Sequence, residues 1–150
     1  MLREEINQAL NLATKAQEKR RMQTLRLISA ALKDRDIAAR TAGKDKVGDD
    51  DIRLMMQKMI KQREESAQIY EEAGRLELAG QEREEIEIIR SFLPKQMSDE
   101  EIAAVCKGVV SEVGATGLRD MGKCMGMIKS RYPGQMDFSR ANQLIKNLIG

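Results

Sequence analysis

Apolar residues recur every three or four positions along almost the whole chain, which is the spacing of residues on one face of an α-helix. Only two prolines occur in 150 residues, and long runs of Glu, Lys, Arg, Gln and Ala separate the apolar positions. Both features favour helix. The pattern therefore predicts an all-α, multihelical protein, with apolar helix faces over residues 2–13, 22–32, 52–60, 76–93, 102–113, 118–132 and 138–149.

The expected helix ends are marked by turn and capping residues. The stretch TAGKDKVG, residues 41–48, contains two glycines and predicts a mobile loop. Pro94 should end the fourth helix, because the residue before a proline avoids the α-helical region. Ser98 followed by Glu101 has the pattern of a capping box that opens the fifth helix. Gly114 is expected to close that helix in the left-handed conformation.

The segment PKQM, residues 94–97, predicts the border between two helical subdomains. The N-terminal subdomain is expected to comprise residues 1–93, and a C-terminal three-helix subdomain residues 98–150. In the C-terminal subdomain, Thr116 is the candidate cap of the sixth helix and Asp137 the candidate cap of the last one.

The composition limits the chemistry that the chain can support. It has two Tyr, two Phe and no Trp, so the core must be aliphatic and use many of the ten Met. The absence of His excludes Ser–His and Cys–His nucleophile pairs. Cys106 and Cys124 lack the spacing of a zinc site, and Cys106 falls on an apolar face, which predicts a core position. We expect no catalytic residue, no metal and no cofactor.

The sequence shows neither a signal peptide nor a membrane segment. No apolar stretch follows Met1, and no run approaches the roughly 20 apolar residues that a membrane-spanning helix needs. The expectation is a cytoplasmic protein without membrane contact.

The net charge of +2 conceals an uneven distribution of charge. Residues 1–48 contain eleven basic and six acidic side chains, residues 49–101 contain eight and fifteen, and residues 102–150 contain seven and three. The two ends are thus basic and the middle is acidic. This division fits either complementary surfaces that aid packing and solubility, or a basic end that meets a polyanion such as RNA.

Two glycines stand four residues apart in the sequence DMGKCMG, residues 120–126. Each costs roughly 1 kcal/mol relative to alanine inside a helix. A helical projection places Gly122 and Gly126 beside the apolar stripe rather than in it. The stripe comprises Leu118, Met121, Met125, Ile128 and Tyr132, and the flank shared by the glycines also carries Arg119, Lys123 and Lys129.

Two explanations for the glycines stay open at this stage. Small residues four apart let a neighbouring helix backbone approach closely. Alternatively, the missing side chains admit a nucleic-acid backbone, whose phosphates the three cations would contact. A phosphate-binding glycine loop is disfavoured, because the pattern matches neither GxxxxGK[ST] nor GxGxxG.

The motif DMGKCMG, preceded by the break at Gly114–Ala115 and by LPKQMSDEEI, closely resembles the GatB/YqeY family. The stretches LRLISAALKDRDI and MIKQREESAQIYEEAGRLELAGQE extend the resemblance over essentially the whole chain. The family contains stand-alone YqeY-like proteins and the tail domain of the GatB component of the tRNA-dependent aspartyl/glutamyl amidotransferase. The resemblance implies a fold of two α subdomains and, for the amidotransferase tail, binding to the outer corner of tRNA.

Carried over by position, the family motif falls on Asp120, Met121, Gly122, Lys123, Met125 and Gly126. Asp120 should occupy the first turn of its helix, and the two methionines should lie in the core. Cys124 stands where the motif more often has valine, which predicts a semi-buried apolar position. The segment YPGQMDFSRANQLIK is a variant of the usual final turn and helix, so RNA contacts by Arg140 and Lys146 are less secure.

We therefore expect a non-catalytic protein that binds tRNA or another structured RNA through Arg119, Gly122, Lys123, Gly126 and Lys129. Such a protein would be suited to assist an amidotransferase or an aminoacyl-tRNA synthetase. The alternatives are a helical adaptor for another protein, suggested by the acidic middle helices and the methionine-rich interior, and a carbon–nitrogen ligase with glutamine as amide donor by family label alone. The parts that perform the amidotransferase chemistry lie outside the region of resemblance.

Overall fold

A computed structural model describes residues 1–149, and within this range all regular structure is helical. The all-α, multihelical fold predicted from the apolar periodicity is confirmed. The chain divides into two compact units, Met1–Leu93 and Pro94–Gly150, the second of which is described to Ile149. Each unit has its own hydrophobic core.

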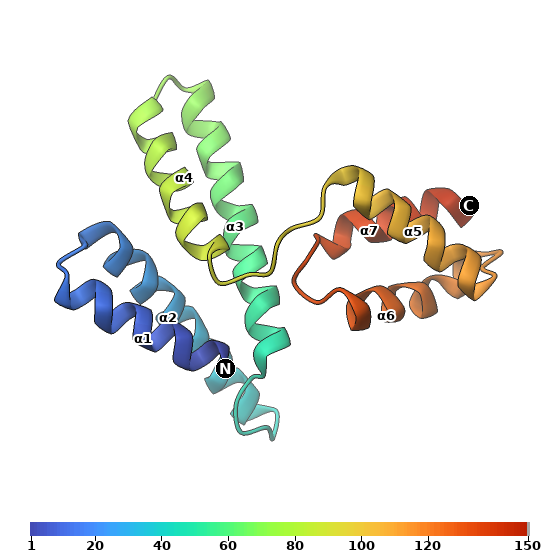
Figure 1. The fold of residues 1–150 in the computed structure, drawn as a ribbon, viewed down its shortest axis with the longest axis horizontal. Coiled ribbons are helices and arrows are strands. Elements are labelled where there is room, and N and C mark those ends of the chain that lie inside the picture. The colour runs from blue at the N-terminus through green and yellow to red at the C-terminus, as the bar shows by residue number, and fades with distance from the viewer. Residues whose placement is uncertain (150) are drawn as a thin grey trace. The chain divides into compact units, whose positions relative to one another are not determined.

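The first unit consists of two helical hairpins. Helices α1 (Leu2–Lys15) and α2 (Lys19–Thr41) form one hairpin, and α3 (Asp49–Glu72) and α4 (Leu76–Arg90) form the other (Figure 1). Helices α2 and α4 also pack against each other. The core is aliphatic and methionine-rich, and its buried residues are Leu2, Ile6, Ala13, Leu25, Ile28, Leu32, Ile52, Met55, Met56, Met59, Ile60, Ile86 and Ile89.

The second unit is a three-helix arrangement of α5 (Asp99–Val113), α6 (Met121–Arg131) and α7 (Phe138–Ile149). A single 3₁₀ turn, η1 (Leu118–Asp120), directly precedes α6. All three helices contact one another around a small core. The buried residues of that core are Ile102, Cys106, Val109, Cys124, Met125, Ile128, Met136, Ala141 and Ile145.

The predicted caps of α5 and α7 are confirmed. The hydroxyl of Ser98 accepts the backbone N–H of Glu101 at 3.1 Å, and the Glu101 carboxylate accepts the N–H of Ser98 at 3.4 Å. Gly114 ends α5 with a φ of 69°, the left-handed conformation that glycine adopts without strain. The Asp137 carboxylate accepts the N–H of Ser139 at 2.9 Å, at the start of α7.

The segment predicted as the border is attached to the second unit. The N–H of Met97 donates to the carbonyl of Gln135 at 2.8 Å. The side-chain amide of Gln96 donates to the carbonyl of Gly134 at 2.6 Å. These bonds connect the chain entering α5 to the turn between α6 and α7.

Some details of the predicted elements are wrong. The sixth helix begins at Met121 rather than at Thr116, because the N–H of Thr116 donates to the side chain of Asp120 and the intervening residues form the 3₁₀ turn. Leu76, Leu118 and Leu148 belong to the predicted apolar helix faces but are 67%, 57% and 45% exposed. Each lies in the first or last turn of its helical segment, where the apolar pattern continues beyond the packed part of the bundle.

The loop between α2 and α3 is anchored near its end, although its composition predicted mobility. The Arg3 guanidinium donates to both carboxylate oxygens of Asp36, at 2.6 and 2.9 Å, and to the carbonyl of Val47 at 3.1 Å. The Asp36 carboxylate also accepts the N–H of Val47 at 3.1 Å. We call these three residues the Arg3–Asp36–Val47 cluster; it connects α1, α2 and the loop.

Candidate nucleic-acid interface

The DMGKCMG segment places two bare backbone positions on the surface of the second unit. Gly122 and Gly126 are exposed, and apart from the adjacent residues and the backbone of the helix itself, no atom lies within 4 Å of the position that a Cβ would occupy at either residue. Arg119, Lys123 and Lys129 are exposed as well. We call these five residues the glycine strip.

The strip occupies one side of α6, and the core occupies the other. In a projection with about 100° per residue, Lys129, Gly122, Gly126 and Lys123 fall within about 120° of one another. Cys124, Met125 and Ile128 fall on the remaining side and are buried, whereas Met121 and Tyr132 are half-buried. The sequence therefore predicted the buried stripe correctly, except for Leu118.

The two glycines do not serve close helix packing in the way that one interpretation of the sequence proposed. Within the second unit that interpretation is wrong, because a neighbouring helix backbone packed against the strip would lie within 4 Å of an added Cβ, and none does. Both glycines belong to one uninterrupted helix, so left-handed backbone geometry does not require them either. The packing of the second unit therefore does not explain their presence.

The cations of the glycine strip carry no ion pair with any residue of the described range 1–149. Other cations of the same unit do: the Arg131 guanidinium donates twice to the Glu112 carboxylate at 2.7 Å, and Arg140 lies 3.2 Å from Asp99. These two arginines are therefore engaged with acidic partners. Arg119, Lys123 and Lys129 leave their positive charges available to a ligand.

Asp120 holds the turn that leads into α6. Its carboxylate accepts the N–H of Thr116 at 3.1 Å and the N–H of Gly117 at 3.4 Å. The hydrogen bond from Thr116, followed by that from Gly117 and the nearby charges of Arg119 and Lys123, holds the pKa of Asp120 below its usual value. Sequence reasoning placed Asp120 in the first turn of the helix and missed these bonds, although aspartate side chains are known to bond to backbone groups three or four residues away.

Both cysteines are free and buried, so neither offers a reactive thiol. The core position predicted for Cys106 is confirmed, and its thiol lies 3.8 Å from the carbonyl of Ala141. Cys124 is fully buried rather than semi-buried. Desolvation raises the pKa of both thiols, which keeps them protonated at neutral pH.

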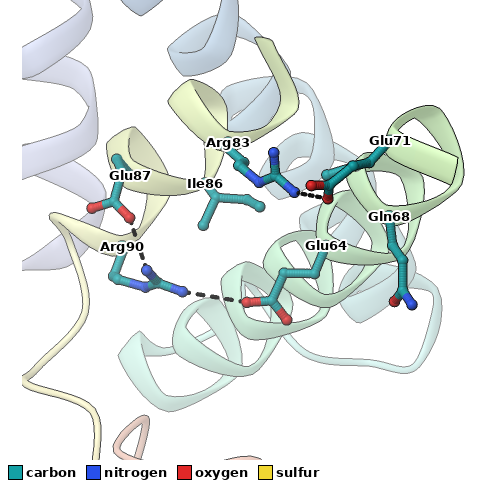
Figure 2. A pocket seen from close by; sticks show the side chains of 8 residues that line it. Glu64, Gln68, Glu71, Arg83, Ile86, Glu87 and Arg90 are labelled. Carbon is teal, nitrogen blue, oxygen red and sulfur yellow. Dashed lines mark hydrogen bonds and ion pairs between the residues drawn. The ribbon is translucent and has the colours of Figure 1, made fainter. Parts of the chain in front are cut away.

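A groove between α3 and α4 is a second candidate for a binding site. Figure 2 shows that its charged side chains are arranged unfavourably for binding a polyanion. Its charged side chains pair with one another: Arg83 with Glu71, and Arg90 with Glu87 at 2.8 Å and with Glu64 at 3.3 Å. The two arginines are therefore already engaged, and the three glutamates outnumber them. The glycine strip is the better candidate for binding phosphate.

Residues 1–149 contain neither a helix that could span a membrane nor a cluster of side chains that could bind a metal ion. No helix in this range is long and apolar enough to cross a membrane. Within the same range, no group of three or more Cys, Asp or Glu side chains is placed to hold a metal ion.

The structure thus defines a helical protein of two units with an exposed basic strip on its second unit. The family model described as "Yqey-like protein" matches residues 3–149. Because the match spans nearly the whole chain, the protein belongs to the YqeY-like family. None of the curated proteins compared with the chain matches it.

Proposed function

We propose that this protein binds structured RNA through the glycine strip and that it does so in the cytoplasm as part of translation, without catalysing a reaction itself. The observation that supports the proposal is the uncovered backbone at Gly122 and Gly126, flanked by cations whose charges are not neutralised within residues 1–149. A nucleic-acid backbone needs both features: room to approach and positive charge for its phosphates.

The energetics of α6 support a role for the glycines outside the fold. Gly126 lies in the middle of α6, where glycine costs roughly 1 kcal/mol relative to alanine. An alanine methyl group at this position would meet no atom beyond the adjacent residues and the backbone of α6 itself. The chain therefore gives up stability at Gly126 with no packing gain, which is the pattern expected where a ligand approaches the backbone.

The proposed contact reads the RNA backbone rather than its bases. None of the four aromatic side chains is among the exposed residues; Tyr70, Phe92, Tyr132 and Phe138 are all half-buried. Proteins that bind single-stranded RNA without sequence preference stack its bases on exposed aromatic side chains, which this protein does not offer. Helical RNA offers its phosphates and shape instead. The resemblance to the amidotransferase tail supports tRNA as the RNA, with accessory action on an amidotransferase or aminoacyl-tRNA synthetase as an extension of the proposal.

The adaptor alternative loses part of its motivation. Besides the acidic middle helices, it relied on methionines as an adaptable binding surface. Nine of the ten methionines are buried or half-buried, and only Met1 is exposed. The methionines therefore fill the two cores instead of forming a surface for a partner protein.

Substitutions at Gly126 distinguish an effect on the stability of the fold from an effect on RNA binding. Gly126→Ala is expected to raise the free energy of unfolding by up to about 1 kcal/mol, because alanine is the better helix former. Gly126→Gln keeps the helix propensity favourable but fills the approach to the backbone, so its affinity for tRNA should fall about tenfold, or about 1.4 kcal/mol. Urea denaturation and a tRNA-binding titration measure the two effects.

Gly108 provides a matched control for this test. It lies inside α5, is exposed, and has no atom within 4 Å of an added Cβ, but it is outside the strip. Gly108→Gln should stabilise the protein similarly and leave tRNA affinity unchanged. If both Gln variants retain the wild-type affinity, the strip is not the RNA-binding surface.

A further inference from the structure

The solvent-facing side of α2 carries four cations at seven-residue intervals: Lys19, Arg26, Lys33 and Arg40. Seven residues advance the position around an α-helix by about −20°, so these side chains stay within a sector of about 60°. They are spaced about 10 Å apart and together span about 31 Å of the helix. We call them the α2 cation row.

The row is exposed and its charges are available. All four side chains are exposed, and within residues 1–149 none of them forms an ion pair. Arg40 donates only to the backbone carbonyl of Asp45, at 3.4 Å. By contrast, Arg20 on another side of the same helix lies 3.2 Å from Glu84 of α4. The acidic side chain of α2 nearest to the row is Asp36, which lies one helical turn from both Lys33 and Arg40. Its carboxylate is bound by Arg3, whose hydrogen bond is the main reason that the pKa of Asp36 is lowered, and the charge of Arg40 contributes to the same shift.

We infer that the α2 cation row is a second contact surface for nucleic acid and binds the phosphate backbone of a double-helical RNA segment. The inference rests on the proposed function for the ligand, but it concerns a different unit of the protein and different residues. A row of cations about 31 Å long, none of which forms an ion pair within residues 1–149, matches the extended, regularly charged backbone of a helical polyanion.

The other occupants of such a surface fit the row less well. A membrane surface would need a continuous apolar helix face available for insertion. In α2, Leu25, Ile28 and Leu32 are buried in the core, and the exposed large apolar side chains are Leu27 and Ile37, ten residues apart. A protein interface is usually centred on aromatic or other large apolar residues. The exposed apolar side chain that falls within the row is Ile37, and α2 contains no aromatic residue. The absence of aromatics also disfavours single-stranded RNA, which binds by base stacking.

A double variant of the full-length protein tests the row. Arg26→Ala/Lys33→Ala should weaken binding to a blunt RNA duplex of about 20 base pairs and lower the slope of log affinity against log salt by about two. Lys15→Ala/Arg35→Ala is the matched control, since it also removes two exposed cations that form no ion pair within residues 1–149. Arg35 projects from about the opposite side of α2. The control should change the slope by much less.

The outcomes are distinct. Equal slopes for the row variant and the control would overturn the inference, even if Gly126→Gln still reduces tRNA binding and so supports the proposed function. Failure of the wild-type protein to bind any structured RNA would overturn both. Sedimentation of the protein without RNA gives a further check. If the row variant changes self-association but not duplex binding, the row contacts the acidic residues of a second copy, and the inference is wrong.

Discussion

The double variant Lys123→Glu/Lys129→Glu is expected to bind tRNA about a hundredfold more weakly than the wild type, equivalent to about 3 kcal/mol of binding free energy. Both lysines are exposed beside the bare backbone of α6, and neither has an ion-pair partner within the described residues. Each reversal removes an attraction to a phosphate and adds a repulsion. A contact with a charged group contributes about 1.5 kcal/mol or more when it is made. A titration at fixed salt concentration measures the loss.

The control for this double variant carries the same change in net charge. Lys95 and Lys107 are exposed lysines of the same unit that lie outside the strip and form no ion pair within residues 1–149. Lys95→Glu/Lys107→Glu should lower the affinity only slightly, through the general field of the protein. Equal losses for the two double variants would show that RNA responds to net charge alone and that the strip is not a specific contact.

Asp36→Ala is expected to lower the free energy of unfolding by about 2 to 3 kcal/mol. The substitution leaves the half-buried Arg3 guanidinium without its carboxylate and the Val47 N–H without its acceptor. The side chains of Arg3 and Asp36 are only 21% and 15% exposed, so water replaces the lost partners incompletely. Urea denaturation at neutral pH measures the loss.

Acid should abolish much of this difference. The hydrogen bond from Arg3 is the main reason that the pKa of Asp36 lies below its usual value, with the Val47 N–H adding to the effect. A carboxyl group whose pKa is lower in the folded state stabilises the fold above its unfolded pKa of about 4, and this stabilisation disappears as the pH falls through the folded value. The stabilities of the wild type and Asp36→Ala should therefore converge below about pH 4.

An exposed ion pair gives the comparison for Asp36. Glu87 lies 2.8 Å from Arg90 on the same helix and is 69% exposed. Because such pairs contribute about 0 to 1 kcal/mol, Glu87→Ala should change stability little. If Asp36→Ala costs no more than Glu87→Ala at neutral pH, the Arg3–Asp36–Val47 cluster does not anchor the loop.

Local signals in the sequence were sufficient to predict the helices and most of their ends. The capping box at Ser98 and the left-handed conformation of Gly114 depend only on residues close in sequence. Both helix ends could therefore be predicted without knowledge of the tertiary structure. The prediction from periodicity that Leu118 belongs to the buried stripe is wrong, because burial depends on the tertiary structure and not on neighbouring residues in the sequence. An apolar residue at the right spacing is buried only if another element covers it, and the first turn before α6 is not covered.

The candidate sites illustrate the same limit. The sequence placed Gly122 and Gly126 on a flank of α6, but close packing and ligand access both agreed with that placement until the surroundings of the two residues were known. The α2 cation row was not recognised at all, although the seven-residue interval from Lys19 to Arg40 is visible in the sequence. Whether those cations were paired depended on side chains of other helices, which periodicity does not locate.

The most direct measurement is an NMR titration of the glycine amides with tRNA at near-physiological salt. Glycine amides give resolved signals, and Gly108 on α5 is an exposed helical glycine outside the strip. If RNA lies against the uncovered backbone, the signals of Gly122 and Gly126 shift or broaden at the lowest tRNA concentrations while that of Gly108 stays in place. If all three respond alike, or if Gly122 and Gly126 remain unchanged while tRNA binds, the RNA lies elsewhere on the protein.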